Sequence, residues 1–175
     1  MKDIKYFILI PFMLILLCIN TSCHSSKKNI KGTEYEYNDK GILGFNITKH
    51  DNKKLYREAQ KWIGTPYQYG GHTKDGTDCS GLVMEIYLEV YNTKLQRNSA
   101  KIMSENCREI SRNALKEGDL IFFATGKNSN RISHVGLYLK DGKFIHSSSS
   151  RGVIISELEQ KYYQRTFVCA GRVRR

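Results

Sequence analysis

The chain has 175 residues, of which 40% are hydrophobic and 26% are charged, and it contains only 2 prolines. This composition fits one folded domain and excludes a collagen-like or largely disordered protein. Lys and Arg outnumber Asp and Glu by 28 to 17, which gives a formal net charge of +11 and predicts anionic partners. The net charge alone does not distinguish nucleic acid, acidic lipid and an acidic polymer as partners.

Residues 1–22 have the features of a secretory signal peptide. Two lysines precede the apolar run 6–19, and small polar residues follow it. This run is short for a membrane span. Ser22 directly precedes Cys23, as in a bacterial lipobox, so we expect Cys23 to become a lipidated N-terminus. An uncut signal anchor and plain secretion are the alternatives.

Residues 23–50 are rich in Ser, Lys, Asn and Gly without a regular apolar period, which predicts a flexible tether to a domain at 51–175. Removing the signal takes away only two Lys and one Asp, so the remaining chain stays basic. Because the chain has no Arg-rich arm or sustained basic helix, we expect no nucleic-acid partner. We expect a monomer anchored by lipid to a bacterial membrane, facing the periplasm or cell wall.

The domain is predicted to begin with helices. Asp51 is placed to cap a helix that ends at Gly64 and Pro66. A glycine-rich loop at 64–78 follows. A second helix is expected to begin near Cys79, and its apolar stripe puts that cysteine on the core-facing side.

Strands are predicted to follow the helices. After a short helix around 99–106, the strand-like runs are 120–124, 134–139, 143–147, 152–156 and 166–173. This order predicts an α+β fold, in which N-terminal helices pack on a central antiparallel sheet of about five or six strands.

Cys79 is the candidate nucleophile. At the start of a helix, unpaired backbone N–H groups and the helix dipole favour a thiolate and lower the pKa of the thiol. Thr77 or Asp78 is expected as the cap, and Gly81 allows close approach at the first turn. The alternative is a buried, inert cysteine, which is how most free cysteines behave.

Two histidines lie on neighbouring strands, and the loop between these strands decides whether the histidines meet. A two-residue loop would put His134 and His146 on opposite faces of the hairpin, which forbids a triad with Cys79. A three-residue loop with Gly142 in the left-handed conformation places His146 opposite Gly136 and diagonal to His134 on one face. Backbones at the diagonal spacing of about 7 to 8 Å allow two imidazole rings to touch.

Five motifs together resemble a known family. They are GTPYQYGG at 64–71, TDCSGLV at 77–83, GDLIFF at 118–123, HVGLYL at 134–139 and FIHSS at 144–148. Residues 52–175 resemble the NlpC family of bacterial cell-wall cysteine peptidases, which have a papain-like fold, and are most similar to its single-domain lipoprotein members.

The resemblance implies a role for each reactive side chain. Cys79 would attack a peptide carbonyl, His134 would act as general acid and base, and His146 would orient the ring of His134. A thioester would form and be released by water. The oxyanion would be bound by the backbone N–H of Cys79 and the hydroxyl of Tyr67, whose alternative role is packing.

The resemblance also places Asp78 and Ser80 at the substrate site, with helix capping and first-turn packing as the alternatives. It implies a peptidoglycan endopeptidase that cleaves stem peptides or their cross-links without a metal or cofactor. The alternatives are a Cys-His amidase or acyltransferase on another envelope amide, a non-catalytic wall-binding module, and a zinc site. Whether Cys107 and Cys169 form a disulfide stays open.

Overall fold

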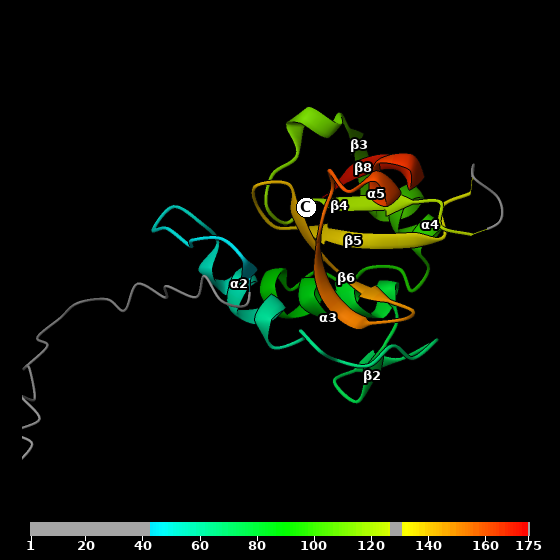
Figure 1. The fold of residues 1–175 in the computed structure, drawn as a ribbon, viewed down its shortest axis with the longest axis horizontal. Helices are drawn as coiled ribbons and strands as arrows, with labels where there is room; N and C mark the ends of the chain where they lie inside the picture. The colour runs from blue at the N-terminus through cyan, green and yellow to red at the C-terminus, as the bar shows by residue number, and fades with distance from the viewer. Residues whose placement is uncertain (1–42, 127–130, 175) are drawn as a thin grey trace, which may run out of the picture. The chain divides into compact units, whose positions relative to one another are not determined.

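The computed structural model describes residues 43–126 and 131–174, which all belong to the second of two units of the chain, 35–175. The predicted α+β fold is confirmed, since helices pack on a six-stranded antiparallel sheet (Figure 1). The predicted signal peptide and Cys23 lie outside the described residues. Within the described part of the chain, no helix combines the length and apolar character needed to cross a membrane.

Helix α2 (Lys53–Gln60) begins one residue later than its predicted cap implies. Asn52 is the cap, because its side-chain oxygen accepts the N–H of Leu55 at 3.1 Å. The prediction that Asp51 caps this helix is therefore wrong. Its carboxylate instead forms an ion pair with Lys140 at 2.8 Å.

Helix α3 (Cys79–Tyr91) begins where the sequence predicts. Asp78 is the cap and accepts the N–H of Gly81 at 2.8 Å. The helix ends at Asn92, which adopts the left-handed conformation with a φ of 50°. Shorter elements complete this half of the domain: β1 (His72–Thr73), β2 (Gly76–Thr77), α4 (Ser99–Lys101) and the π-helix η1 (Ile102–Asn106).

The sheet has the strand order β3-β8-β4-β5-β6-β7. Its strands are β3 (Cys107–Ile110), β4 (Leu120–Phe123), β5 (His134–Tyr138), β6 (Lys143–Ser148), β7 (Gly152–Glu157) and β8 (Phe167–Val173). All except β3 match the predicted runs to within one residue at each end. Five elements of the described residues were not predicted: the short strands β1 and β2 inside the predicted glycine-rich loop, the edge strand β3, the 3₁₀-helix η2 (Arg112–Ala114) and α5 (Lys161–Thr166).

The β5–β6 hairpin has the register that puts both histidines on one face. Leu137 pairs with Ile145, which is the register of the three-residue loop, and both Asp141 and Gly142 adopt left-handed φ values, of 51° and 75°. Because side chains alternate along a strand, His134 and His146 then project from the same side of the sheet.

The two faces of the sheet bury different side chains. Apolar residues of α2 and α3 pack on one face, against β4, β5, β6 and β7. On the other face, Tyr163 of α5 packs against Phe123 and Phe144, with ring centroids 5.4 and 4.9 Å apart. The two histidines join this aromatic cluster, since Phe123 lies 6.0 Å from the ring of His134 and Phe144 lies 5.0 Å from that of His146.

The folded domain begins before residue 51. Leu43, Phe45 and Ile47 are buried in the core, and the ring of Phe45 lies 5.2 Å from that of Tyr56. The prediction of a tether over 23–50 is therefore wrong for its last part, because alternating apolar side chains there find a packing surface.

Candidate active site

Cys79, His134 and His146 line one cavity of about 250 Å³. They come from the start of α3, the start of β5 and the middle of β6, so three distant motifs meet at one place. The Cys79 thiol is free, as the nucleophile prediction requires. Other hydroxyl-bearing residues line the same cavity: Tyr67, Thr125, Ser133, Ser147, Ser148, Ser149, Tyr162 and Tyr163.

The two imidazole rings are in direct contact. His134 Nε2 lies 2.9 Å from His146 Nδ1, and the rings are nearly perpendicular, with centroids 5.0 Å apart. Gly136 allows this arrangement, because a Cβ at that position would lie 2.6 Å from the ring of Phe144, which packs on His146. His134 Nε2 is thus engaged, so Nδ1 is the ring nitrogen that this contact leaves open.

Two buried hydroxyl groups lie at the ring nitrogen of His146 that does not face His134. His146 Nε2 lies 3.0 Å from both Ser156 Oγ and Tyr163 Oη. Sequence analysis missed both residues. Ser156 carries no motif, and Tyr163 lies on a helix of six residues that is too short for a clear apolar period.

Burial keeps both histidines neutral at pH 7. It lowers the pKa of His134 to about 4. It lowers the pKa of His146 to about 2, with further lowering by the charges of His134 and Arg151. An imidazole with no charge can accept a proton from the thiol, so His134 is in the form that a general base needs.

Burial also raises the pKa of the Cys79 thiol. The backbone N–H groups of Val135, Ser80 and Cys79 itself donate to the sulfur and oppose this shift, but they do not outweigh the loss of solvent. The expectation of a lowered pKa at this helix start is therefore wrong. The raised pKa of Cys79 and the lowered pKa of His134 both favour the uncharged forms of these two side chains.

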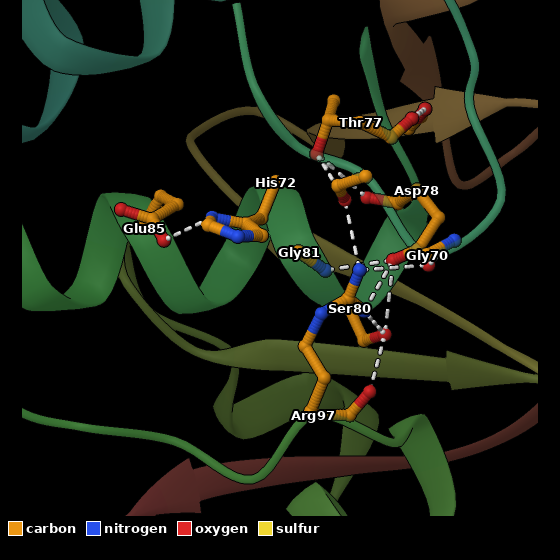
Figure 2. Close-up of polar contacts among 10 residues, drawn as sticks. Gly70, His72, Thr77, Asp78, Ser80, Gly81, Glu85 and Arg97 are labelled. Carbon is orange, nitrogen blue, oxygen red and sulfur yellow. Dashed lines mark hydrogen bonds and ion pairs between the residues drawn. The ribbon is translucent and has the colours of Figure 1, made fainter.

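Asp78 lies at the centre of a polar network around the start of α3 (Figure 2). Its carboxylate accepts the N–H of Gly70 at 2.8 Å as well as that of Gly81. Arg97 forms an ion pair with it at 2.6 Å. Burial alone would raise the pKa of Asp78, but these hydrogen bonds together hold it below its usual range.

Ser80 belongs to the same network. Its hydroxyl donates to the Arg97 carbonyl at 2.9 Å and lies 2.6 Å from Arg97 Nη1. The polar atoms of Asp78 and Ser80 thus hold the local backbone. These contacts are those expected if the two residues cap the helix and pack its first turn, which were the alternatives to a role at the substrate site. Arg97 was missed by sequence analysis, because a lone arginine in a polar loop carries no local signal.

A second cavity of about 320 Å³ adjoins the first. It shares Tyr67, Cys79 and Ser133 with the first cavity and continues past Asp78 and Arg97. Tyr67 is 37% exposed and borders both cavities, so its hydroxyl is not part of a packed core. Burial raises the pKa of Tyr67, and the nearby Cys79 and Asp78 act in the same direction.

The other two cysteines of the described residues are not cross-linked. Cys107 and Cys169 are free thiols, and the sheet register pairs them with Val173 and Phe122 respectively. Among residues 43–126 and 131–174, no three or more His, Cys, Asp or Glu side chains are grouped so that they would hold a metal ion.

Comparison with known proteins gives a consistent result. Residues 64–172 match the NlpC/P60 family. The chain is 40% identical over 119 residues to "Probable endopeptidase NlpC" of Escherichia coli K12. This match covers 68% of this chain and 76% of that protein. Over 120 residues, 69% of this chain, it is 38% identical to "Murein DD-endopeptidase MepS/Murein LD-carboxypeptidase" of the same strain and covers 62% of it.

A solved structure shares the fold. The crystal structure of an NlpC/P60 family protein from Bacillus cereus is 30% identical and superposes with a TM-score of 0.63. The match covers 73% of this chain and 41% of that one.

Proposed function

The chain belongs to the NlpC/P60 family, and from this premise we propose that it is a peptidoglycan endopeptidase that cleaves stem-peptide amide bonds with Cys79 as its nucleophile. The observation that carries the proposal is the 2.9 Å contact between His134 Nε2 and His146 Nδ1, in the cavity that Cys79 also lines. That contact leaves His134 Nδ1 as the base for the thiol.

The proposed reaction begins from the neutral pair. Cys79 Sγ attacks the carbonyl carbon of the scissile amide while its proton moves to His134 Nδ1. The oxyanion is bound by the backbone N–H of Cys79 and by the hydroxyl of Tyr67. His134 then gives the proton to the leaving amine, and the C–N bond breaks to leave a thioester.

Water completes the proposed cycle. His134 removes a proton from the water, the oxygen attacks the thioester, and the C–S bond breaks to give a carboxylate and the thiol. His146 holds the ring of His134 in place through both steps. As a neutral residue, it acts by orientation rather than by charge.

The shape of the site supports a peptide substrate. The cavities of about 250 and 320 Å³ meet at Cys79, so a chain can extend to either side of the nucleophile. Peptidoglycan stem peptides carry free carboxylates, which suit a chain with a net charge of +11. The relative named as a murein endopeptidase supports the same substrate class.

We also propose that the protein acts in the cell envelope as a lipid-anchored monomer. The support is in the sequence, where the signal-like apolar run 6–19 is followed by small polar residues, the last of which is Ser22, and then by Cys23. Mass spectrometry of the membrane fraction tests this proposal, because a diacylated Cys23 gives a defined mass increase. An unmodified N-terminal peptide would contradict it.

Digestion of purified peptidoglycan tests the enzyme proposal. The mature protein should release fragments with new amine ends in the stem peptides, and mass analysis of the fragments identifies the bond. Cys79→Ala should release none. Alkylation of the thiol should abolish activity and a chelator should not. If no new ends appear at any pH from 5 to 9, the endopeptidase proposal is wrong.

A further inference from the structure

The proposed mechanism uses His146 but leaves its second ring nitrogen unexplained. We propose that Ser156 and Tyr163 are positioning residues, whose hydroxyl oxygens accept the Nε2 proton of His146 whenever His134 becomes charged. The chemistry of this inference rests on the proposed function, while the positions of the atoms come from the structure alone.

The geometry isolates this hydroxyl pair from solvent. Ser156 Oγ and Tyr163 Oη lie 3.2 Å from each other and 3.0 Å from His146 Nε2. The three residues are only 2 to 4% exposed. Within residues 43–126 and 131–174, no other group hydrogen-bonds this nitrogen.

Counting protons shows why an acceptor is needed there. When both rings are neutral, the contact between His134 Nε2 and His146 Nδ1 holds one proton, and this proton must be on His134 Nε2 if His134 Nδ1 is to accept the thiol proton. When His134 has taken the thiol proton, both of its nitrogens carry protons. His146 Nδ1 must then accept, so the one proton of the neutral His146 ring has to sit on Nε2.

The charged state of His134 therefore requires an acceptor at His146 Nε2. A buried N–H without a partner is costly, and among the residues that the structure describes only the two hydroxyl oxygens are placed to accept it. Either oxygen can do so, since each hydroxyl can accept one bond and donate another. The pair is thus expected to be redundant, and losing both hydroxyls should cost much more than losing one.

Packing keeps the phenol in place. The ring of Tyr163 meets that of Phe144 edge to face at 4.9 Å and lies 5.4 Å from that of Phe123. Besides His134, the charged group that lowers the pKa of His146 is Arg151, and the Cys79 thiol lines the same cavity. Neither is placed to accept a proton from His146 Nε2.

The sharpest test compares two variants of equal shape. In a Tyr163→Phe background, Ser156→Thr keeps a hydroxyl and Ser156→Val does not, while both add one methyl group. We expect kcat on soluble stem-peptide fragments to be about 10- to 100-fold lower for the valine variant, with KM and the unfolding midpoint alike in the two. Equal kcat values would overturn the proposal.

A second measurement separates this inference from the proposed substrate. The rate at which iodoacetamide alkylates Cys79 at pH 7, followed by peptide mass mapping, depends on the same proton transfer but needs no peptidoglycan. The valine variant should again react more slowly than the threonine variant. If this difference appears while the parent protein digests no peptidoglycan, the positioning role stands and the proposed function fails.

Tyr56→Phe provides the control for loss of a buried phenol hydroxyl. Its hydroxyl donates to the Leu139 carbonyl at 3.3 Å, beyond the end of β5 that is remote from His134. This variant should alkylate at the parent rate. A decrease equal to that of the valine variant would show a general effect of lost hydroxyls and would overturn the proposal.

Discussion

Arg97 makes a two-pronged ion pair with Asp78, with Nη1 2.6 Å from Oδ1 and Nη2 2.9 Å from Oδ2. Nη2 also donates to the Gly71 carbonyl at 2.8 Å. Because Asp78 caps α3 and also holds the N–H of Gly70, this arginine fixes the glycine-rich loop relative to the helix that carries Cys79.

We predict that Arg97→Ala destabilises the protein by about 2 to 3 kcal/mol, because it leaves a buried carboxylate without its partner. The cost stays below that of a fully buried pair, since the side chain of Arg97 is 35% exposed. Urea denaturation of the parent protein and of Arg97→Ala measures this loss in the free energy of unfolding. The stability of Arg97→Lys should lie between that of the parent protein and that of Arg97→Ala, since lysine keeps the charge but not the two-pronged geometry. A change below about 0.5 kcal/mol would contradict this role for the ion pair.

We predict that the alkylation rate of Cys79 keeps rising above pH 8.5, where an ordinary thiol begins to level off. The reason is that burial raises the pKa of this thiol, and only the thiolate reacts quickly. Stopped-flow alkylation from pH 5 to 11 measures the profile, with a Cys79→Ser protein as the background. A plateau reached below pH 7 would instead indicate a thiolate–imidazolium resting pair.

We predict that stability decreases as the pH falls from about 6.5 towards 4. The pKa of His134 is about 4 and that of His146 about 2 in the folded protein, whereas both are near 6.5 in an unfolded chain. The unfolded state therefore binds more protons in this window, so acid favours unfolding, by up to about 1.4 kcal/mol per pH unit for each histidine.

Denaturant titrations at several pH values measure this slope. His146→Asn should flatten it, because one of the two buried bases is removed. His50→Asn is the control, since His50 is exposed. An unchanged slope in His146→Asn would show that other groups cause the acid sensitivity.

We predict that Gly136→Ala lowers both stability and activity. The new methyl group would lie 2.6 Å from the ring of Phe144, which packs on His146, so the imidazole pair should shift. Overpacking of this kind typically costs about 1 to 3 kcal/mol.

Gly142→Ala in the same hairpin is the control. A Cβ at position 142 would meet only open space, but the left-handed φ of 75° is unfavourable for alanine. The variant should therefore lose about 1 to 2 kcal/mol of stability while the folded enzyme keeps its activity. Thermal unfolding and specific activity separate the two effects. Full activity in folded Gly136→Ala would contradict the contact argument.

Local signals account for what the sequence predicted well. A capping residue and a glycine-rich loop predict the helix that begins at Cys79, and apolar runs between turn residues predict five of the strands. The hairpin register, in contrast, stayed open between a two-residue and a three-residue loop, and the pairing of Leu137 with Ile145 in the structure selects the second. β3 was missed because a short edge strand with the charged residues Arg108 and Glu109 lacks a clear pattern.

The pKa of Cys79 shows where local reasoning fails. The helix start does supply N–H donors to the sulfur, as expected, but the direction of the shift depends on how much solvent the rest of the fold removes. Burial is a property of the whole domain. The same is true of Arg97, which reaches Asp78 from 19 residues away.

By itself the sequence determined the family, the α+β fold and the residue types of the nucleophile and its two histidines, because these follow from local patterns and ordered motifs. Only the tertiary structure decided that His146 contacts Ser156 and Tyr163, that Arg97 holds the cap of α3, and that burial raises the pKa of the Cys79 thiol. Each of these depends on which distant side chains meet in a space without water, and no local pattern encodes that.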